Sequence, residues 1–429
     1  PQSRVIHFEG QTSGTDETQG VKRYQVINQT AFFDKWRTVL ARYPERYGDI
    51  RRAVEHTVRT RILVLDACML TPDRDSGSLR MWHLLRLFTQ PGRKVTFAAA
   101  SLEYRAPYVG QLQADGIEVL HLPYYNSIET FLRTRGDEYD VIVLSRLEVA
   151  AQWLAAVRKW APRAFVVYDT VDLHFLRAER EAEVQNSATT RAQAEAQKKQ
   201  ELRLIRATDR TWVVSQVEQA LLTPLVPDAK IAVLSNIHEP KPIGREFGER
   251  TGLLFIGSFR HPPNVDAMLW YGRDVLPHVR QLLPGVVTTI IGGDLPASVR
   301  ALAADDVAVT GYIEDIEPYF TETRLSIAPL RYGAGVKGKV NQAMSYGVPV
   351  VVTPMAAEGM HLTDGRDALI ADGARAFAEA IARAYQDETL WRQLSLAGRA
   401  NIEAHFSRDV AAQELEKTLE LARRTSGSG

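Results

Sequence analysis

Short apolar runs alternate with segments of helical period along most of the chain. Arg61–Leu65 is apolar on both faces of an extended chain, as expected of a strand buried within a sheet. Residues 78–88 repeat apolar side chains at helical spacing. Further strands are expected at Val95–Ala100, Glu118–Leu122, Val141–Leu144, Phe165–Tyr168, Thr211–Val214 and Ile231–Leu234. Strands that alternate with helices predict a parallel, doubly wound sheet.

The same pattern restarts after a polar segment, residues 238–250, that holds two prolines and two glycines. Such a composition is typical of an interdomain linker. The strands expected beyond it are Leu253–Ile256, Val287–Ile291, Ala308–Thr310, Leu325–Ala328, Val348–Val352 and Ala368–Ile370, with long helices at 374–386, 390–404 and 408–423. The sequence therefore predicts an α/β fold in which two doubly wound, Rossmann-like domains face one another across a cleft.

This organisation sets the expected domain boundaries. The first domain covers 61–236 and is completed by the terminal helix 408–423, a linker covers 237–250, and the second domain covers 251–407. Residues 1–36 are polar and too short to hold a core, and residues 37–60 are expected to form a charged helical connector. We expect 1–60 to be the tail of a preceding domain with that connector. Residues 185–200 are expected to form a solvated helix.

Composition excludes several classes of protein. The chain has 429 residues, 45% of them apolar, which suffices for two or three domains. A formal net charge of zero argues against general nucleic-acid binding. A single cysteine, Cys68, excludes a disulfide framework and a cysteine-based zinc site. No apolar run reaches the length of a membrane span. The chain begins at Pro1 with no signal peptide, so we expect a fragment of a longer protein.

The most informative motif is a glycine-rich loop that is followed by a helix. Gly333, Gly335 and Gly338 carry no Cβ and let backbone amides approach a ligand. Lys337 and Lys339 add two positive charges beside these amides, and the helix adds its N-terminal dipole. Together these features predict a site for a phosphate or diphosphate. The alternative is a surface turn with two solvated lysines.

The turn after the first strand is a candidate part of the same site. Gly77 permits close approach of the backbone, and Ser76 or Ser78 can cap the helix that follows. An ordinary strand-to-helix turn has the same composition, so the two interpretations are nearly equal.

A third candidate lies at the carboxyl end of the strand 165–168. Asp169, Asp172 and His174 can supply a base, a group that orients it, or a ligand for a sugar hydroxyl. The alternative is a polar loop in which one aspartate caps a helix. One histidine with two aspartates is weak support for a metal site, and we expect none.

The second domain adds two candidate segments. Gly257 and Ser258 end its first strand, and Arg260 can bind a phosphate in a bidentate way. Glu358 follows the strand 348–352 and can reach a ligand hydroxyl. A surface arginine and a helix-capping glutamate are the respective alternatives.

From about residue 61 to 407 the chain resembles the retaining glycosyltransferases of family four, which have the two-domain GT-B fold. The resemblance rests on the order of the elements and on the strings at 66–79, 168–174, 233–236, 254–267, 333–344 and 357–359. It implies that the second domain binds a nucleotide diphosphate sugar. It also implies that no metal or cofactor is needed, because basic residues and helix amides hold the diphosphate.

The resemblance implies roles for particular residues. Lys337 and Lys339 match the basic pair that contacts the donor diphosphate, and Glu358 matches the glutamate near the donor sugar. His174 matches a histidine that projects toward the donor sugar, and Gly77 matches a glycine close to the phosphates. The catalytic set is therefore His174, Lys337 and Glu358. The donor side comprises Gly77, Gly257, Ser258, Arg260, Gly335, Lys337, Lys339, Gln342 and Glu358, and the acceptor side comprises Asp169 and Asp172.

The chain departs from the family pattern at one pair of positions. Many members carry two glutamates there, the second of which contacts the nucleotide ribose, whereas this chain has Ala334 and Gln342. The Gln342 amide can still form a hydrogen bond with a hydroxyl.

Residues 1–36 resemble the end of a family-two transferase of the GT-A type, which implies a fusion or association of transferase domains. His7 matches a metal-binding position of that fold, but without the rest of that site it is given no function.

The predicted function is retaining transfer of a hexose to a hydroxyl of a bacterial surface glycan such as O-antigen, lipopolysaccharide or capsule. The expected partners are a nucleotide sugar and a glycan or lipid-linked glycan, and the expected location is the cytoplasm or the inner face of the cytoplasmic membrane. A nucleotide-sugar epimerase of the same fold and a catalytically silent carbohydrate-binding module remain as alternatives.

Overall fold

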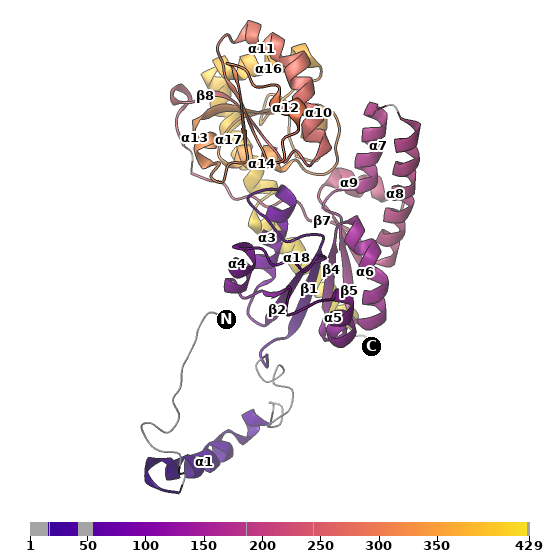
Figure 1. Cartoon of the computed structure of the whole chain (residues 1–429), viewed down its shortest axis with the longest axis vertical. Coiled ribbons are helices and arrows are strands. Elements are labelled where there is room, and N and C mark those ends of the chain that lie inside the picture. The colour runs from indigo at the N-terminus through magenta and orange to yellow at the C-terminus, as the bar shows by residue number, and fades with distance from the viewer. Residues whose placement is uncertain (1–15, 17, 42–54, 186, 243, 427–429) are drawn as a thin grey trace. The chain divides into compact units, whose positions relative to one another are not determined.

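The computed structural model describes residues 16, 18–41, 55–185, 187–242 and 244–426 (Figure 1). Contacts divide the chain into one unit of residues 1–59 with 91–93 and a second unit of residues 60–90 with 94–429. Residues 1–15 and 17 of the segment that resembles the end of a GT-A transferase, His7 included, lie outside the described residues.

The first unit contains a short 3-10 helix, η1 (Gly20–Lys22), and the helix α1 (Arg23–Leu40), in which no residue is buried. Of the helical connector expected at 37–60, residues 37–40 are helical as the end of α1, residues 55–57 form a turn, and residues 42–54 lie outside the described residues. Residues 23–40 contain no glycine or proline, the residue types that interrupt helices.

A seven-stranded parallel sheet forms the first half of the second unit, in the order β3-β2-β1-β4-β5-β6-β7. Its strands are β1 (Thr60–Asp66), β2 (Arg93–Ala99), β3 (Glu118–Leu120), β4 (Val141–Ser145), β5 (Phe165–Asp169), β6 (Arg210–Val213) and β7 (Ile231–Val233). Its helices are α3 (Ser76–Phe88), α4 (Tyr108–Ala114), α5 (Ile128–Arg135), η2 (Gly136–Glu138), α6 (Leu147–Trp160), α7 (His174–Gln185), α8 (Ala188–Ala207), α9 (Gln216–Leu222) and the terminal α18 (Arg408–Ser426).

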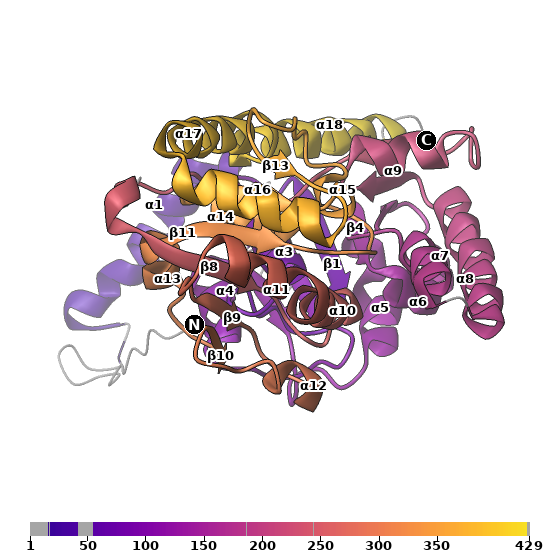
Figure 2. The same cartoon turned by 90° about the horizontal axis from the view of Figure 1, so that it is seen from above.

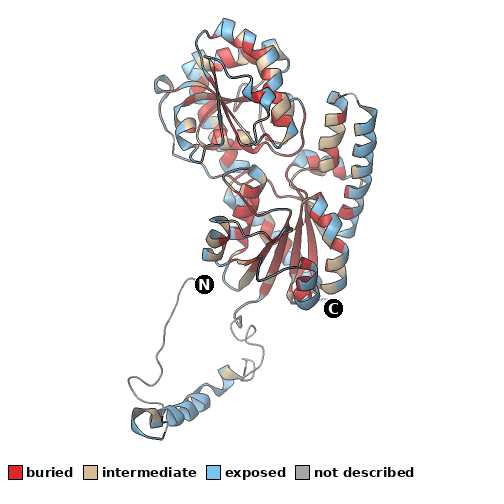
Figure 3. Cartoon of the chain, in the orientation of Figure 1, coloured by how far each residue is buried: buried red, intermediate tan, exposed pale blue. Residues whose placement is uncertain are grey.

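Both faces of this sheet are covered, which explains its continuous apolar strands. Ile62 and Val64 point into a cluster with side chains of α3, α4 and α18. Leu63 and Leu65 alternate with them and pack against α5, α6, α8 and α9 on the other face. Figure 3 shows the buried strands between exposed outer helix surfaces. Burial on both faces is typical of parallel sheets.

A six-stranded parallel sheet forms the second half of this unit, in the order β10-β9-β8-β11-β12-β13. Its strands are β8 (Thr251–Ile256), β9 (Thr288–Ile291), β10 (Val307–Gly311), β11 (Thr323–Ala328), β12 (Val350–Val352) and β13 (Leu369–Ile370). The other elements are η3 (Phe247–Glu249), α10 (Pro262–Trp270), η4 (Tyr271–Val275), α11 (Leu276–Leu282), α12 (Ala297–Arg300), α13 (Glu317–Glu322), α14 (Gly338–Ser345), α15 (Pro354–Ala357), α16 (Ala374–Gln386) and α17 (Glu388–His405). In Figure 2 the helices α14 and α16 lie close to the strand β11.

The predicted α/β fold of two doubly wound parallel sheets is confirmed. The domain boundaries near residues 236 and 251 stay predictions. In both sheets the chain changes direction beside the first strand, between β1 and β4 and between β8 and β11. Ligands of open α/β sheets bind at the carboxyl ends of strands at such a switch point.

Candidate functional site

A cavity of about 580 Å³ lies between the carboxyl ends of the two sheets. Its wall includes residues that follow β1 and β4 in the first sheet and β8 and β11 in the second. The residues predicted from sequence that line it are Gly77, Asp172, Gly257, Ser258, Arg260, Gly335, Lys337, Lys339 and Gln342. Asp169, His174 and Glu358, which were predicted with them, do not line it.

The glycine-rich loop and the start of α14 lie tightly against residues of the first sheet's domain. Gly335 has a φ of +67°, and a Cβ there would lie 3.0 Å from the Cβ of Asp172. A Cβ on Gly338 would collide with the side chain of Ser76 at the start of α3. The N-termini of α3 and α14 therefore meet at the cavity, where both helix dipoles favour negative charge.

Lys337 and Lys339 flank this helix start. The Lys337 Nζ donates to the carbonyl oxygens of Ala334 (3.2 Å) and Gly335 (2.5 Å). The Lys339 Nζ donates to the Oδ1 of Asn264 at 2.7 Å. Among the residues that the structure describes, neither ammonium group has a carboxylate within ion-pair distance. Two lysines held by neutral oxygens in one cavity leave a positive charge that a bound anion can neutralise.

Removal from water shifts the pKa of both lysines. Burial lowers the pKa of Lys337 to about 8, against the opposing effect of the Glu358 and Glu218 carboxylates. Burial, together with the positive charge of Lys337, lowers the pKa of Lys339 to about 7. A lowered lysine pKa shows that the protein's own groups compensate the charged form poorly. An anion placed beside the two groups reverses this shift.

The turn before α3 differs in detail from the prediction. The helix cap is Asp75, whose Oδ1 accepts the amide of Ser78 at 2.8 Å, and is not Ser76 or Ser78. Asp75 has the extended backbone of a cap residue, whereas Ser76 and Ser78 lie within the helix, and the Ser78 hydroxyl instead donates to Asp75. Gly77 leaves room for Arg146, because a Cβ there would lie 2.9 Å from its Nη2.

Asp169 lies in the core and not on the acceptor side of the cavity, which corrects its predicted role. It is 0% exposed, and its Oδ2 binds the Nη1 of Arg80 at 2.8 Å and the Ser145 hydroxyl at 3.3 Å. The same guanidinium donates to the carbonyl oxygen of Leu234. Asp169 therefore ties β5 to α3 and to the end of β7.

Asp172 and His174 form a polar group at the start of α7. The Nε2 of His174 lies 3.4 Å from the Oδ1 of Asp172, and Arg177 donates to the other oxygen of this carboxylate. Burial lowers the pKa of His174 and outweighs the effect of the nearby Asp172. His174 is thus paired with Asp172, and Asp172 lines the cavity whereas His174 does not.

Two buried glutamates hold this loop by its backbone. Glu201 accepts the amides of His174 (3.4 Å) and Phe175 (2.9 Å), and Glu218 accepts the amide of Leu173 at 3.2 Å. Burial raises the pKa of each glutamate to about 7. Sequence reasoning missed both residues, because their contacts lie 26 or more positions away in the chain.

Glu358 is held by Arg180 of α7. Two hydrogen bonds of 2.8 Å join the guanidinium to both carboxylate oxygens, and Arg180 also donates to the carbonyl oxygen of Gly333 at 2.7 Å. Arg180 therefore fixes the glycine-rich loop and Glu358 together. Sequence reasoning missed it, although His174, Arg177 and Arg180 recur at a spacing of three on one helix.

Tyr312, which lines the cavity and which the sequence reasoning also missed, connects the second domain to the loop that precedes α3. Its hydroxyl donates to the Oδ2 of Asp73 at 2.5 Å, and the Arg74 guanidinium lies 4.6 Å from its ring centroid. Arg260 lies at the rim, where its side chain is 78% exposed and its Nε lies 2.9 Å from Asp294. Arg260 is thus available at the surface but already paired.

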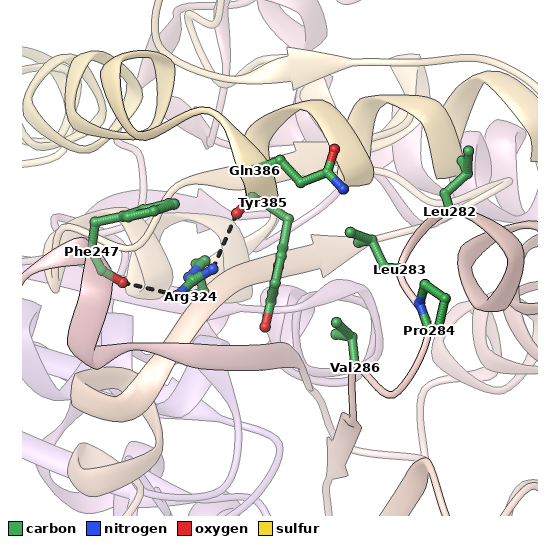
Figure 4. Close-up of a pocket in the computed structure, with 8 residues that line it drawn as sticks. All are labelled: Phe247, Leu282, Leu283, Pro284, Val286, Arg324, Tyr385 and Gln386. Carbon is green, nitrogen blue, oxygen red and sulfur yellow. Dashed lines mark hydrogen bonds between the residues drawn. The ribbon is translucent and has the colours of Figure 1, made fainter.

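A second hollow, of about 370 Å³, lies beside Phe247, Arg324 and Tyr385 (Figure 4). It adjoins the amino ends of β8, β9 and β11, opposite to the end at which such sheets bind ligands. Arg324 there donates to the carbonyl oxygens of Phe247 and Tyr385 and is stacked between their rings. Both Nη atoms of Arg324 are thus engaged by the protein, and the hollow lies at the wrong end of the sheet, so the first cavity is the better candidate.

Among the described residues, no group of three or more His, Cys, Asp or Glu side chains is arranged to hold a metal ion. Nor is any helix in the described part of the chain long and apolar enough to cross a membrane.

Comparison with known proteins supports a class for this protein. Residues 250–387 match the family model described as "Glycosyl transferases group 1". A curated relative, an uncharacterized 44.6 kDa protein in the cps region of Klebsiella pneumoniae, is 29% identical over 138 residues, which are 30% of this chain. The match spans 36% of that relative's length.

Solved structures share the fold across most of the chain. Sucrose-phosphate synthase from Thermosynechococcus elongatus aligns with a TM-score of 0.62 at 16% identity, covering 86% of this chain and 100% of that one. Anabaena HepE in complex with UDP and glucose aligns with a TM-score of 0.64 at 14% identity, covering 84% and 100%. TarM, known from Staphylococcus aureus, aligns with a TM-score of 0.66 at 10% identity, covering 85% and 99%.

The chain has the GT-B fold of two Rossmann-like domains, as the sequence predicted. The group 1 match covers the part that contributes the glycine-rich loop and both lysines. Together these findings support a glycosyltransferase.

Proposed function

We propose that the protein is a retaining glycosyltransferase that moves a hexose from a nucleotide diphosphate sugar to a hydroxyl of a bacterial surface glycan. The observation that carries this proposal is the pair of lysines, with no ion-pair partner among the described residues, at the start of α14. A diphosphate at that point is neutralised by two ammonium groups and by the free amides of the helix. HepE has been solved with UDP-glucose, which supports a donor of this class.

The chemistry follows from where charge develops. The bond between the anomeric carbon and the diphosphate breaks, and the diphosphate gains negative charge. Lys337, Lys339 and the α14 amides stabilise that charge more in the transition state than in the bound donor. The acceptor oxygen bonds to the anomeric carbon on the same face, and its proton passes to the departing phosphate oxygen. Retention of configuration follows from this same-face path.

The remaining donor-side residues surround that position. Gly77, Gly257, Ser258 and Gly335 allow the backbone to approach the nucleotide sugar, and Gln342 is proposed to bind the ribose. All of them line the cavity. Arg260 is proposed to meet a phosphate from the rim, where it exchanges Asp294 for the ligand.

His174 and Glu358 are proposed to serve the donor sugar in different ways. His174 lies two residues beyond the lining residue Asp172, and a shift of the first turn of α7 brings it toward the sugar. Glu358 acts through Arg180, which binds it and the Gly333 carbonyl oxygen at once. In this proposal Glu358 positions the glycine-rich loop.

The acceptor is proposed to be a glycan or a lipid-linked glycan, met in the cytoplasm or at the inner face of the cytoplasmic membrane. The curated relative from the cps region agrees with a role in a surface glycan. Asp172 is the remaining first-domain carboxylate of the predicted acceptor side that lines the cavity.

The direct test is a panel of nucleotide sugars screened by thermal unfolding. A donor that binds the folded state at one hundred times its dissociation constant stabilises it by about 2.7 kcal/mol. We expect one nucleotide diphosphate hexose to raise the unfolding temperature, and the matching nucleoside monophosphate to raise it much less. Equal effects of the monophosphate and the nucleotide sugar would show that the diphosphate is not the group recognised. Product analysis with the donor alone separates transfer from epimerisation.

Transfer is also expected to survive chelation by EDTA. Lys337 and Lys339 supply the positive charge that a divalent cation otherwise provides at a diphosphate. The measurement is product formation with and without EDTA, using the donor that the thermal screen identifies. Loss of all product, with recovery on adding magnesium or manganese, would contradict the assignment of the diphosphate to the lysines.

A further inference from the structure

Two loops at the carboxyl ends of β2 and β3 present a group of aromatic rings. Tyr104 follows β2, and His121 and Tyr124 follow β3. The His121 ring lies between the others, with its centroid 5.0 Å from that of Tyr104 and 5.4 Å from that of Tyr124. Tyr104 is 56% exposed and Tyr124 is 79% exposed. Both pairs are packed edge to face, and large rings that gather in this way while open to solvent mark a candidate surface for binding a ligand.

The two loops hold each other in place. The amide of Leu122 donates to the carbonyl oxygen of Leu102 at 2.9 Å, and the Leu102 amide donates to Ala99 at 2.9 Å. Leu102 is buried and has a φ of +51°, an unfavourable conformation for a residue with a branched side chain. Strain of this kind persists where surrounding contacts fix the backbone. The backbones of the two loops that carry the tyrosines are therefore held together before any ligand binds, which lowers the entropy cost of binding.

Arg105 connects these rings to the cavity. It is the next residue after Tyr104, and it lines the cavity wall. Among the described residues, no carboxylate lies within ion-pair distance of its guanidinium. The nearby Glu103 accepts the amide of Met69 at 3.3 Å.

The other arginines that line the first-domain side of the cavity are already paired. Arg74 lies 3.6 Å from Asp73, Arg146 lies 2.8 Å from Asp66, and Arg177 donates to Asp172. Among the arginines on this side of the cavity, Arg105 is therefore the one that has no carboxylate partner among the described residues. An uncompensated guanidinium is suited to a planar anionic group, which it can bind with two hydrogen bonds.

We propose that Tyr104, Arg105 and Tyr124 bind the acceptor glycan and that Arg105 selects an acceptor sugar with an anionic group. This inference rests on the proposed function and names the substrate class of its acceptor side. The tyrosine rings pack against the apolar faces of successive sugar rings, and their hydroxyls bind the sugar hydroxyls. Arg105 binds the carboxylate of a uronic acid or a phosphate ester on the same glycan. The donor diphosphate remains with Lys337 and Lys339.

The test uses the full chain on an array of immobilised bacterial oligosaccharides of three kinds: those with uronic acids, those with phosphate esters, and neutral ones. The wild-type protein is expected to bind one anionic kind and to bind neutral glycans at least tenfold more weakly. Which anionic kind it binds identifies the group that Arg105 recognises. Arg105→Gln is expected to lose about tenfold in affinity for that kind, and Arg105→Lys to lose less, because a lysine keeps the charge without the bidentate fork.

Further variants test the tyrosine rings separately from Arg105. Tyr124→Ala is expected to weaken binding to the same glycans about tenfold, and Arg203→Gln, an exposed arginine of α8, is expected to change nothing. The inference is overturned if wild-type protein binds neutral and anionic glycans equally, if it binds none of the three kinds, or if Arg105→Gln binds as wild type does.

Thermal stabilisation by nucleotide sugars is measured on the same variants. This measurement distinguishes failure of the proposed transferase function from failure of the acceptor assignment. Arg105→Gln should keep the wild-type response to the donor, because the donor diphosphate is held by the second domain. If no nucleotide sugar stabilises the wild type, the proposed function fails whatever the array shows. If the donor binds but the array result is one of the three that overturn the inference, the acceptor assignment alone fails.

Discussion

Replacing Lys337 or Lys339 with alanine should lower the affinity for the nucleotide sugar and the rate of transfer by about ten- to a hundredfold each. One charge-assisted hydrogen bond contributes roughly 1.5–3 kcal/mol, which corresponds to one to two decades. In the structure both ammonium groups are held by neutral oxygens and meet at one helix start. Calorimetry gives the affinity and product formation gives the rate, on the same preparations.

The pH dependence of affinity offers a second measurement of the same groups. Without ligand, the pKa of Lys337 is about 8 and that of Lys339 is about 7, and a bound diphosphate raises both values. At a pH above these pKa values the lysines are neutral, and they must take up protons when the diphosphate binds. The affinity for the diphosphate therefore falls as pH rises. The slope approaches tenfold per pH unit for each lysine that takes up a proton. From pH 7 to 8.5 wild-type affinity should drop about tenfold or more, and each alanine variant should show a shallower slope.

A control and a conservative variant make this prediction specific. Lys199→Ala removes an exposed lysine of α8 whose side chain is 77% exposed, and it should change neither affinity nor slope. Lys339→Arg keeps a charge beside Asn264 without a titration in this range, so it should retain part of the affinity and lose part of the slope. Wild-type affinity and slope in both alanine variants would contradict the diphosphate assignment.

The fold could be predicted because its strands are buried on both faces. In β1 both alternating sets of side chains, Ile62 with Val64 and Leu63 with Leu65, enter apolar clusters, so the strand is a continuous apolar run. The positions of the glycine-rich loop and of Gly257 followed from the same reasoning, since both come directly after predicted strands. Candidate residues at the carboxyl ends of parallel strands converge on one cavity.

The partners of individual side chains could not be predicted in the same way. Asp169 stands at a strand end, as a site residue would, but its partner Arg80 is 89 positions away in the chain. Glu358 is likewise engaged by Arg180 at a separation of 178 positions. Such pairings depend on how helices dock against sheets, which the periodicity of the sequence does not contain. The sequence therefore indicated which candidate residues lie at one cavity, but not which of their charges are already paired within the protein.

Replacing Arg80 with methionine should destabilise the protein by about 3–5 kcal/mol, the usual effect of removing one partner of a buried ion pair. Arg80 is 1% exposed and Asp169 is 0% exposed. Without the guanidinium, the Asp169 carboxylate keeps the Ser145 hydroxyl at 3.3 Å, and the carbonyl oxygen of Leu234 loses a donor at 2.8 Å. Urea denaturation of wild type and variant gives the difference in the free energy of unfolding.

Two further variants show whether the loss of stability comes from the Asp169 carboxylate that is left buried without its partner. Arg280→Met breaks an exposed pair with Asp306, in which the arginine side chain is 48% exposed, and should cost less than about 1 kcal/mol. Arg80→Met combined with Asp169→Asn removes the buried negative charge as well, and should recover a large part of the loss. If Arg80→Met costs no more than Arg280→Met, then Asp169 does not need Arg80 in the core. The buried ion pair would in that case contribute no more to stability than the exposed one.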